Sequence, residues 1–134
     1  NIVNEQTAEW NAEKAQQIVQ SVIDSGQAFN VIYAENDDMA KGAVAALDKA
    51  NISHGVGKDV IVMGFDCNKW ALEELLNQNW NYDGQCNPYQ ASYIEDVIKK
   101  LESGEKIDEK TIIMDEKGFD ATTITQDDVD QFGI

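Results

Sequence analysis

The amino-acid sequence predicts an α/β fold in which a parallel sheet is flanked by helices on both faces. Short apolar stretches alternate along the chain with longer stretches of helical periodicity, which is typical of parallel sheets with crossover helices. The segment "DVIVMGFD" at residues 59–66 is apolar almost throughout, as expected for a strand buried on both faces of such a sheet. The 134 residues suffice for one domain or a large part of one.

The first expected helix covers residues 12–25, with Asn11 as a cap at its start and Gly26 at its end. Its apolar residues recur at the spacing of one helical face: Ala15, Ile18, Val19, Val22 and Ile23. A short strand at residues 31–34 follows. It leads into a second helix, whose apolar face comprises Met39, Ala43, Ala46, Leu47 and Ala50.

The strand at residues 59–66 leads into a third helix at about residues 68–77. A short strand and turn at residues 79–87 precede a fourth helix over residues 88–103. We expect Asn87 to cap that helix and Pro88 to occupy its first position.

A last strand is expected at residues 111–115, before an irregular tail in which residues 125–128 fit a capping box. Helices and strands should therefore alternate along the chain, with right-handed crossovers.

The charge of the chain excludes some classes of partner. Ten basic residues against 25 acidic ones give a net charge of -15. Such a surface repels nucleic acid and anionic membranes, so we expect no nucleic-acid partner. The longest fully apolar run, residues 60–65, is too short to span a bilayer. No signal peptide is visible, which leaves the compartment open.

Polar residues follow three of the expected strands, where open α/β sheets bind their ligands. They are Glu35-Asn36-Asp37, Asp66-Cys67-Asn68 and Gln85-Cys86-Asn87, and Trp10 precedes the first helix. Carboxylates accept hydrogen bonds from hydroxyls, amides donate and accept them, and an indole can cover the C–H face of a sugar ring. This set suits a neutral polyol, whereas no glycine-rich phosphate loop is present.

Each of these residues has a purely structural alternative. Asn36 or Asp37 can serve only as a helix cap, Asp66 as a turn residue, Trp10 as a core residue and Gln85 as a loop residue. We expect Asp37 or Asp38 to start the second helix, which would leave Asn36 free to face the cleft.

The sequence favours neither catalysis nor a metal site. Cys67 as a nucleophile would need a nearby base, and the single His54 lies in a separate loop. Cys67 and Cys86 end consecutive strands, so a disulfide between them is geometrically possible. Their spacing matches no zinc motif, and the acids of residues 115–120 lack the spacing of a calcium loop. We therefore expect no catalytic residues, no metal and no cofactor.

Four segments recur in the same order in the type I periplasmic sugar-binding proteins of ABC transporters: "AEWNAEKA", "VIYAENDDMAKGA", "DVIVMGFD" and "CNPYQASY". The chain resembles the ribose- and galactose-binding branch over nearly its whole length. "CNP" and the ending "TIIMDEKGFD" are similar to galactofuranose-binding relatives. The resemblance implies a lobe of the flavodoxin-like type, in an incomplete form.

The resemblance also implies roles for individual residues. Trp10 corresponds to the aromatic that stacks on the sugar, and Asn36 and Asp66 to ligands of its hydroxyls. The fourth ligand position falls on Cys86, one residue after Gln85. Because a shift by one residue turns a strand side chain to the opposite face, Gln85 and Asn87 are rival candidates.

In this family two α/β lobes close on the sugar like a hinge. The resemblance assigns residues 1–87 to part of the C-terminal sugar-binding lobe. Residues 88–110 correspond to a helix and connection that pack with the N-terminal lobe, and residues 111–134 to the last strand and tail. Alone, this chain would expose apolar surface and a strand edge. We expect its completion by the missing N-terminal lobe, by a second copy, or by a refolded sheet.

The sequence thus predicts the sugar-recognition portion of an extracytoplasmic solute-binding protein. It would deliver a monosaccharide or small oligosaccharide to the membrane permease of an ABC importer, without catalysis. The location implied is periplasmic or extracellular, with or without a lipid anchor. The alternative is the effector-binding domain of a lac-repressor-family regulator or a sugar sensor. A small α/β enzyme is a third option. It is disfavoured because the sequence contains no recognisable pair of a nucleophile and a general base.

Overall fold

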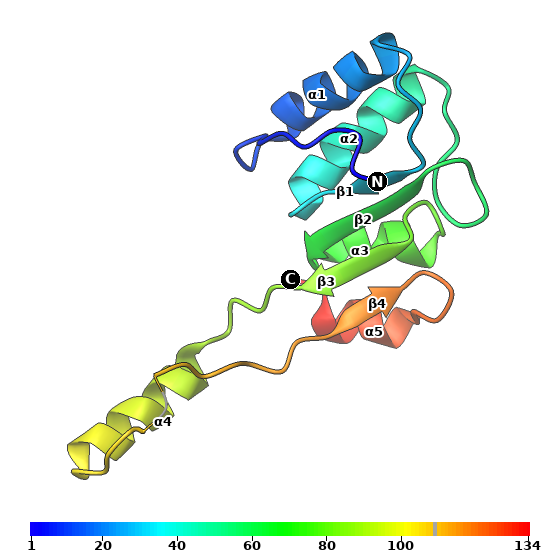
Figure 1. Ribbon diagram of the computed structural model, residues 1–134. Helices are drawn as coiled ribbons and strands as arrows, with labels where there is room; N and C mark the ends of the chain where they lie inside the picture. Colours follow the sequence, from blue (N-terminus) through cyan, green and yellow to red (C-terminus); the bar gives the residue numbers. More distant parts are fainter. Residues whose placement is uncertain (109) are drawn as a thin grey trace.

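The computed structural model describes residues 1–108 and 110–134. Its elements are, in order, α1 (Ala12–Asp24), β1 (Val31–Tyr33), α2 (Asp37–Lys49), β2 (Ile61–Asp66), α3 (Lys69–Leu76), β3 (Tyr82–Gln85), α4 (Ala91–Glu102), β4 (Gly118–Asp120) and α5 (Gln126–Phe132). The predicted α/β class is confirmed (Figure 1). The first element is the predicted helix, whereas the last one is a helix, α5, that follows the final strand.

The strands form one sheet in the order β1-β2-β3-β4. The first three are parallel, and β4 runs antiparallel to β3. The last strand lies at Gly118–Asp120 and not at residues 111–115 as the sequence predicted. After α4 the chain returns to β3 only at Lys117, whose carbonyl accepts from the Gln85 N–H at 2.8 Å. Pairing with β3, and not local β-propensity, therefore decides where the strand forms.

The helices that contact the sheet cover one of its faces. Right-handed crossovers from β1 to β2 and from β2 to β3 place α2 and α3 on the same side. Val62 points to that side and is fully buried, whereas its neighbour Ile61 points away and is 41% exposed. The expectation of helices on both faces is therefore not met by the described residues.

The open face of the sheet carries a row of aromatic rings. The rings of Tyr33 and Phe65 lie 5.2 Å apart, and those of Phe65 and Tyr82 lie 6.3 Å apart. Tyr33 on the edge strand β1 is 61% exposed. The predicted exposure of apolar surface and of a strand edge is thus present in this structure.

The helix α4 projects away from the rest of the chain (Figure 1). None of its residues is buried, although Ile94, Ile98 and Leu101 form an apolar stripe at helical spacing. It begins at Ala91, so the prediction of a start at Pro88 with Asn87 as cap is wrong. Asn87 instead closes a turn in front of the helix, where its Oδ1 accepts from the Tyr89 N–H at 2.8 Å. Residue 109 of the predicted 88–110 connection lies outside the described residues.

Candidate functional site

The strands β1, β2 and β3 end at one edge of the sheet. Tyr33 of β1 is in register with Met63 of β2, so Asn36 and Asp66 follow this pair by the same number of residues. Asp66 is in register with Gln85 of β3. The starts of α1 and α2 lie at the same edge (Figure 1). The structure thus gathers the segments that carry the sequence-predicted site residues.

Asn36 caps α2. The helix begins at Asp37, as expected, but Asn36 is not left free, because its Oδ1 accepts from the Met39 N–H at 2.9 Å. Only half of the amide is used in this way. Within residues 1–108 and 110–134, no hydrogen bond engages its Nδ2, so Asn36 can cap the helix and still donate to a ligand.

Asp66 ends β2 in an uncommon backbone conformation. Its φ is +123°, and that of the following Cys67 is +60°, so the chain turns sharply at the strand end. Burial, and next the charge of Asp38, raise the pKa of the Asp66 carboxyl, against a hydrogen bond from the Asp37 backbone. The half-buried carboxylate lies at the sheet edge beside the start of α2.

The turn from Asp66 to Asn68 is held from two sides. Asp37, which is fully buried, accepts through Oδ2 from the Asn68 N–H at 2.8 Å and from Asn68 Nδ2 at 3.1 Å. The segment after α5 holds the other side, where Ile134 N–H donates to the Cys67 carbonyl at 3.0 Å. The position of Asp66 therefore depends on both the start of α2 and the end of the described chain.

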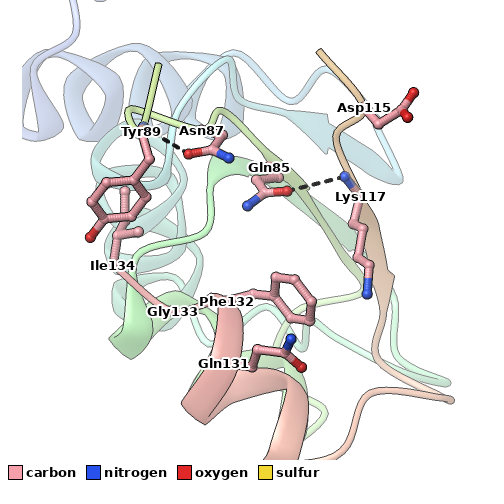
Figure 2. Close-up of a pocket in the computed structure, with 9 residues that line it drawn as sticks. All are labelled: Gln85, Asn87, Tyr89, Asp115, Lys117, Gln131, Phe132, Gly133 and Ile134. Atoms are coloured by element: carbon pink, nitrogen blue, oxygen red, sulfur yellow. Dashed lines mark hydrogen bonds between the residues drawn. The ribbon is translucent and has the colours of Figure 1, made fainter. Parts of the chain in front are cut away.

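Gln85 and Asn87 are engaged on the β4 side of the edge. Gln85 Oε1 accepts from the Lys117 N–H at 3.3 Å, and the Asn87 N–H donates to Glu116 Oε1 at 2.7 Å. Both line a cavity of about 300 Å³ (Figure 2). The other residues around it are Tyr89, Asp115, Lys117, Gln131, Phe132, Gly133 and Ile134.

Asn36, Asp66 and Trp10 do not line this cavity. Its remaining lining residues were missed because the sequence placed residues 111–134 in a strand and an irregular tail. The aromatic Tyr89, directly after Pro88, was the one signal that could have drawn attention to it. In Figure 2 the rings of Tyr89 and Phe132 lie at two sides of the cavity.

Trp10 is 64% exposed, which rules out the alternative that it belongs to the core. Its φ is +58° and that of Glu9 is +52°, so the chain turns directly before α1. Asn11 caps that helix through a hydrogen bond from Lys14 N–H to Oδ1 at 2.9 Å. The indole is thus held at the start of α1 with its surface open to solvent.

The two cysteines differ in environment, and both are free thiols. Cys67 is fully buried, and burial together with the charge of Asp83 raises the pKa of its thiol. Cys86 is exposed. Among residues 1–108 and 110–134, no group of three or more His, Cys, Asp or Glu side chains is arranged to hold a metal ion.

Curated relatives of the chain are import and sugar-binding proteins. It is 29% identical over 124 residues to the fructose import binding protein of Bifidobacterium longum, covering 91% of this chain and 36% of the relative. It is 31% identical over 77 residues to the ribose import binding protein of Bacillus subtilis, covering 58% of this chain and 23% of the relative. The chain thus spans between about a quarter and little more than a third of the length of these relatives.

Solved structures agree in fold. A galactofuranose binding protein superposes with a TM-score of 0.84 at 21% identity, over 98% of this chain and 45% of that protein. The binding protein of the arabinose ABC transporter from Shewanella sp. ANA-3, bound to L-arabinofuranose, gives a TM-score of 0.81 at 26% identity, over 91% of this chain and 40% of that protein.

A family model described as "Periplasmic binding protein domain" matches residues 1–106, which is most of the chain. The chain therefore belongs to the periplasmic binding protein domain family.

Proposed function

We propose that the chain is the sugar-recognition portion of an extracytoplasmic solute-binding protein that serves an ABC importer. The observation that carries this proposal is the edge where Asn36 and Asp66 follow register-matched strands. One offers an unused amide donor, and the other offers a half-buried carboxylate. Hydroxyl groups are the natural partners of this pair.

Trp10 would supply the apolar side of the site. Its exposed indole precedes α1 at the same edge, where it can cover the C–H face of a sugar ring. Gln85 and Asn87 are secondary candidates, because each already uses its side-chain oxygen on a backbone N–H. Their amide nitrogens remain available as donors toward a ligand in the neighbouring cavity.

The charge of the edge favours a neutral sugar over a sugar phosphate. Glu35, Asp37, Asp38 and Asp66 all lie in or beside it, and their field would repel a phosphate. The printed names of the relatives, which include fructose, ribose and galactofuranose, support the same class of ligand. They also support import over the regulator alternative.

Binding without catalysis fits the chemistry of this edge. Cys67 is the nucleophile nearest to Asp66, and its buried thiol has a raised pKa that keeps it protonated. The predicted domain division fits the same proposal. The exposed apolar stripe of α4 would pack on the N-terminal lobe, and the open face of the sheet would be covered by further chain or by a second copy.

A thermal-shift screen of the complete natural polypeptide tests the proposal. The panel contains neutral pentoses, hexoses, methyl furanosides and the matching sugar phosphates. Because a ligand that binds only the folded state raises the melting temperature, at least one neutral sugar should do so while its phosphate does not. Stabilisation by phosphates alone, or by no member of the panel, would refute the proposed function.

A further inference from the structure

Two fully buried carboxyl groups meet behind the candidate site. Asp37 is the first residue of α2 and Asp83 lies in the middle of β3, and both have no exposed surface. Their side chains are within hydrogen-bonding reach of each other. Gly64 of β2 lies in register with Asp83. A Cβ at Gly64 would come within 2.7 Å of Asp37 Oδ1.

One oxygen of each carboxyl lacks any other partner. Asp37 Oδ1 and Asp83 Oδ2 are both buried and make no other hydrogen bond to the described residues. Two ionised carboxylates cannot satisfy each other, because both only accept hydrogen bonds. A single proton between these two oxygens would satisfy both, which removes an otherwise large cost of burial.

The surroundings decide which carboxyl keeps the charge. Asp37 Oδ2 accepts two hydrogen bonds from Asn68, the N-cap of α3, and these favour its ionised form. The Asp83 carboxyl has one backbone hydrogen bond, from Cys67, and the weak Cys67 thiol donor, whose sulfur lies 3.8 Å from Oδ1. Asp83 is therefore the proton donor and Asp37 the charged acceptor.

The other titratable groups nearby oppose a second negative charge. Asp66 and Cys67 face the pair from β2 and the turn after it, and Asp38 of α2 lies beside Asp66. Burial, and next the charge of Asp37, raise the pKa of Asp83 to about 9. Burial also raises the pKa of Asp37, against the hydrogen bonds from Asn68.

We propose that Asp37 and Asp83 share one proton and act as positioning residues for Asp66. The shared proton stabilises the charged Asp37, which holds Asn68 and so fixes the turn that presents Asp66. The inference rests on the proposed function, because it assumes that Asp66 binds the sugar. Deprotonation of Asp83 at alkaline pH would place two charges side by side, displace Asp37 from Asn68 and weaken sugar binding.

The test compares the wild type with Asp83→Asn in the complete natural polypeptide. The asparagine amide can donate to Asp37 Oδ1 but cannot titrate. Calorimetry with D-ribose, D-fructose and methyl β-D-galactofuranoside, from neutral to alkaline pH, should show wild-type affinity falling by tenfold or more. In Asp83→Asn the alkaline loss should be absent. Asp59→Asn, an exposed control outside the site, should follow the wild type.

A second readout needs no sugar. Infrared difference spectroscopy should show a protonated carboxyl band in the folded wild type at neutral pH that is lost in Asp83→Asn. If Asp83→Asn does not fold, Asp83→Thr provides a hydroxyl donor on a strand-favouring residue. Absence of the band, or the same alkaline loss in wild type and variant, overturns the inference. If no sugar of the wider thermal-shift panel binds either, the proposed function and the positioning role both fail, whereas the infrared band still decides whether the proton is shared.

Discussion

The Asp37 carboxylate accepts hydrogen bonds from both amide groups of Asn68, from the backbone N–H at 2.8 Å and from Nδ2 at 3.1 Å. This contact joins the start of α2 to the turn between β2 and α3. Because Asp66 opens that turn, the contact connects the two segments that carry the candidate sugar ligands Asn36 and Asp66. A buried acid thus fixes the turn that presents the half-buried Asp66.

Asn36 should have two separable roles. In Asn36→Ala the α2 cap and the amide donor are both lost, so the unfolding free energy should fall by about 1 kcal/mol and sugar affinity should also fall. Asn36→Ser keeps a capping oxygen but has no amide N–H to donate to the ligand. It should retain stability and lose affinity. Denaturant unfolding and calorimetry on both variants check this, and equal affinity in Asn36→Ser and wild type would contradict the binding role.

Trp10 should contribute to binding and not to folding. Because its side chain is largely exposed, Trp10→Ala should change the unfolding free energy by less than about 0.5 kcal/mol. Its sugar affinity should fall about fivefold or more, since stacking of an aromatic on an apolar surface contributes on the order of 1 kcal/mol or more. Trp10→Phe, which keeps a ring, should recover part of the loss. Affinity unchanged in Trp10→Ala would remove the indole from the site.

The Asp83 carboxyl should make stability depend on pH. Its pKa of about 9 in the folded chain lies far above that of an aspartate in the unfolded chain, which is ionised at neutral pH. Between these two values the folded state binds one more proton, so the unfolding free energy falls as pH rises, by up to about 1.4 kcal/mol per pH unit. Asp83→Asn should flatten this decline in urea unfolding above neutral pH. Parallel curves for wild type and variant would contradict the assignment.

The helix α4 should matter only when its partner surface is present. Ile98 is half exposed and no residue of α4 is buried, so Ile98→Lys should leave the isolated chain within about 0.5 kcal/mol of wild type. In the complete natural polypeptide the same change should cost about 1–3 kcal/mol, because a buried apolar side chain becomes charged. Asp96→Lys on the opposite side of the helix is the control. Equal small effects of both substitutions in the complete polypeptide would refute packing of α4 on another lobe.

Local patterns predicted most of the fold. The apolar run of β2 and the periodicity of α1 and α2 depend on residues close in sequence, and the structure contains these elements within a few residues of the expected positions. The position of β4 depends on where the chain pairs again with β3, and the start of α4 depends on the turn closed by Asn87. The hydrophobic pattern of a short sequence segment predicts neither position.

In the candidate site, too, the sequence predicted the features that depend on local patterns and missed those that depend on contacts between distant segments. The rule that ligands bind at strand ends made Asn36 and Asp66 candidate ligands from sequence alone. It could not identify Asp83, because a lone acid within a strand gives no sign of its partner on a distant helix. The contact of Gln85 with Lys117 could not be predicted either, because the segment that carries Lys117 was expected to leave the sheet.

Calorimetry of sugar binding to the complete natural polypeptide and its Asp66→Ala/Trp10→Ala double variant tests the central claim most directly. We expect the wild type to bind at least one neutral pentose, hexose or furanoside. Loss of the charged hydrogen-bond acceptor alone should cost about 1.5–3 kcal/mol, so the double variant should lose most or all detectable binding. Binding that survives in the double variant would contradict the site, and wild-type protein that binds no sugar would contradict the function.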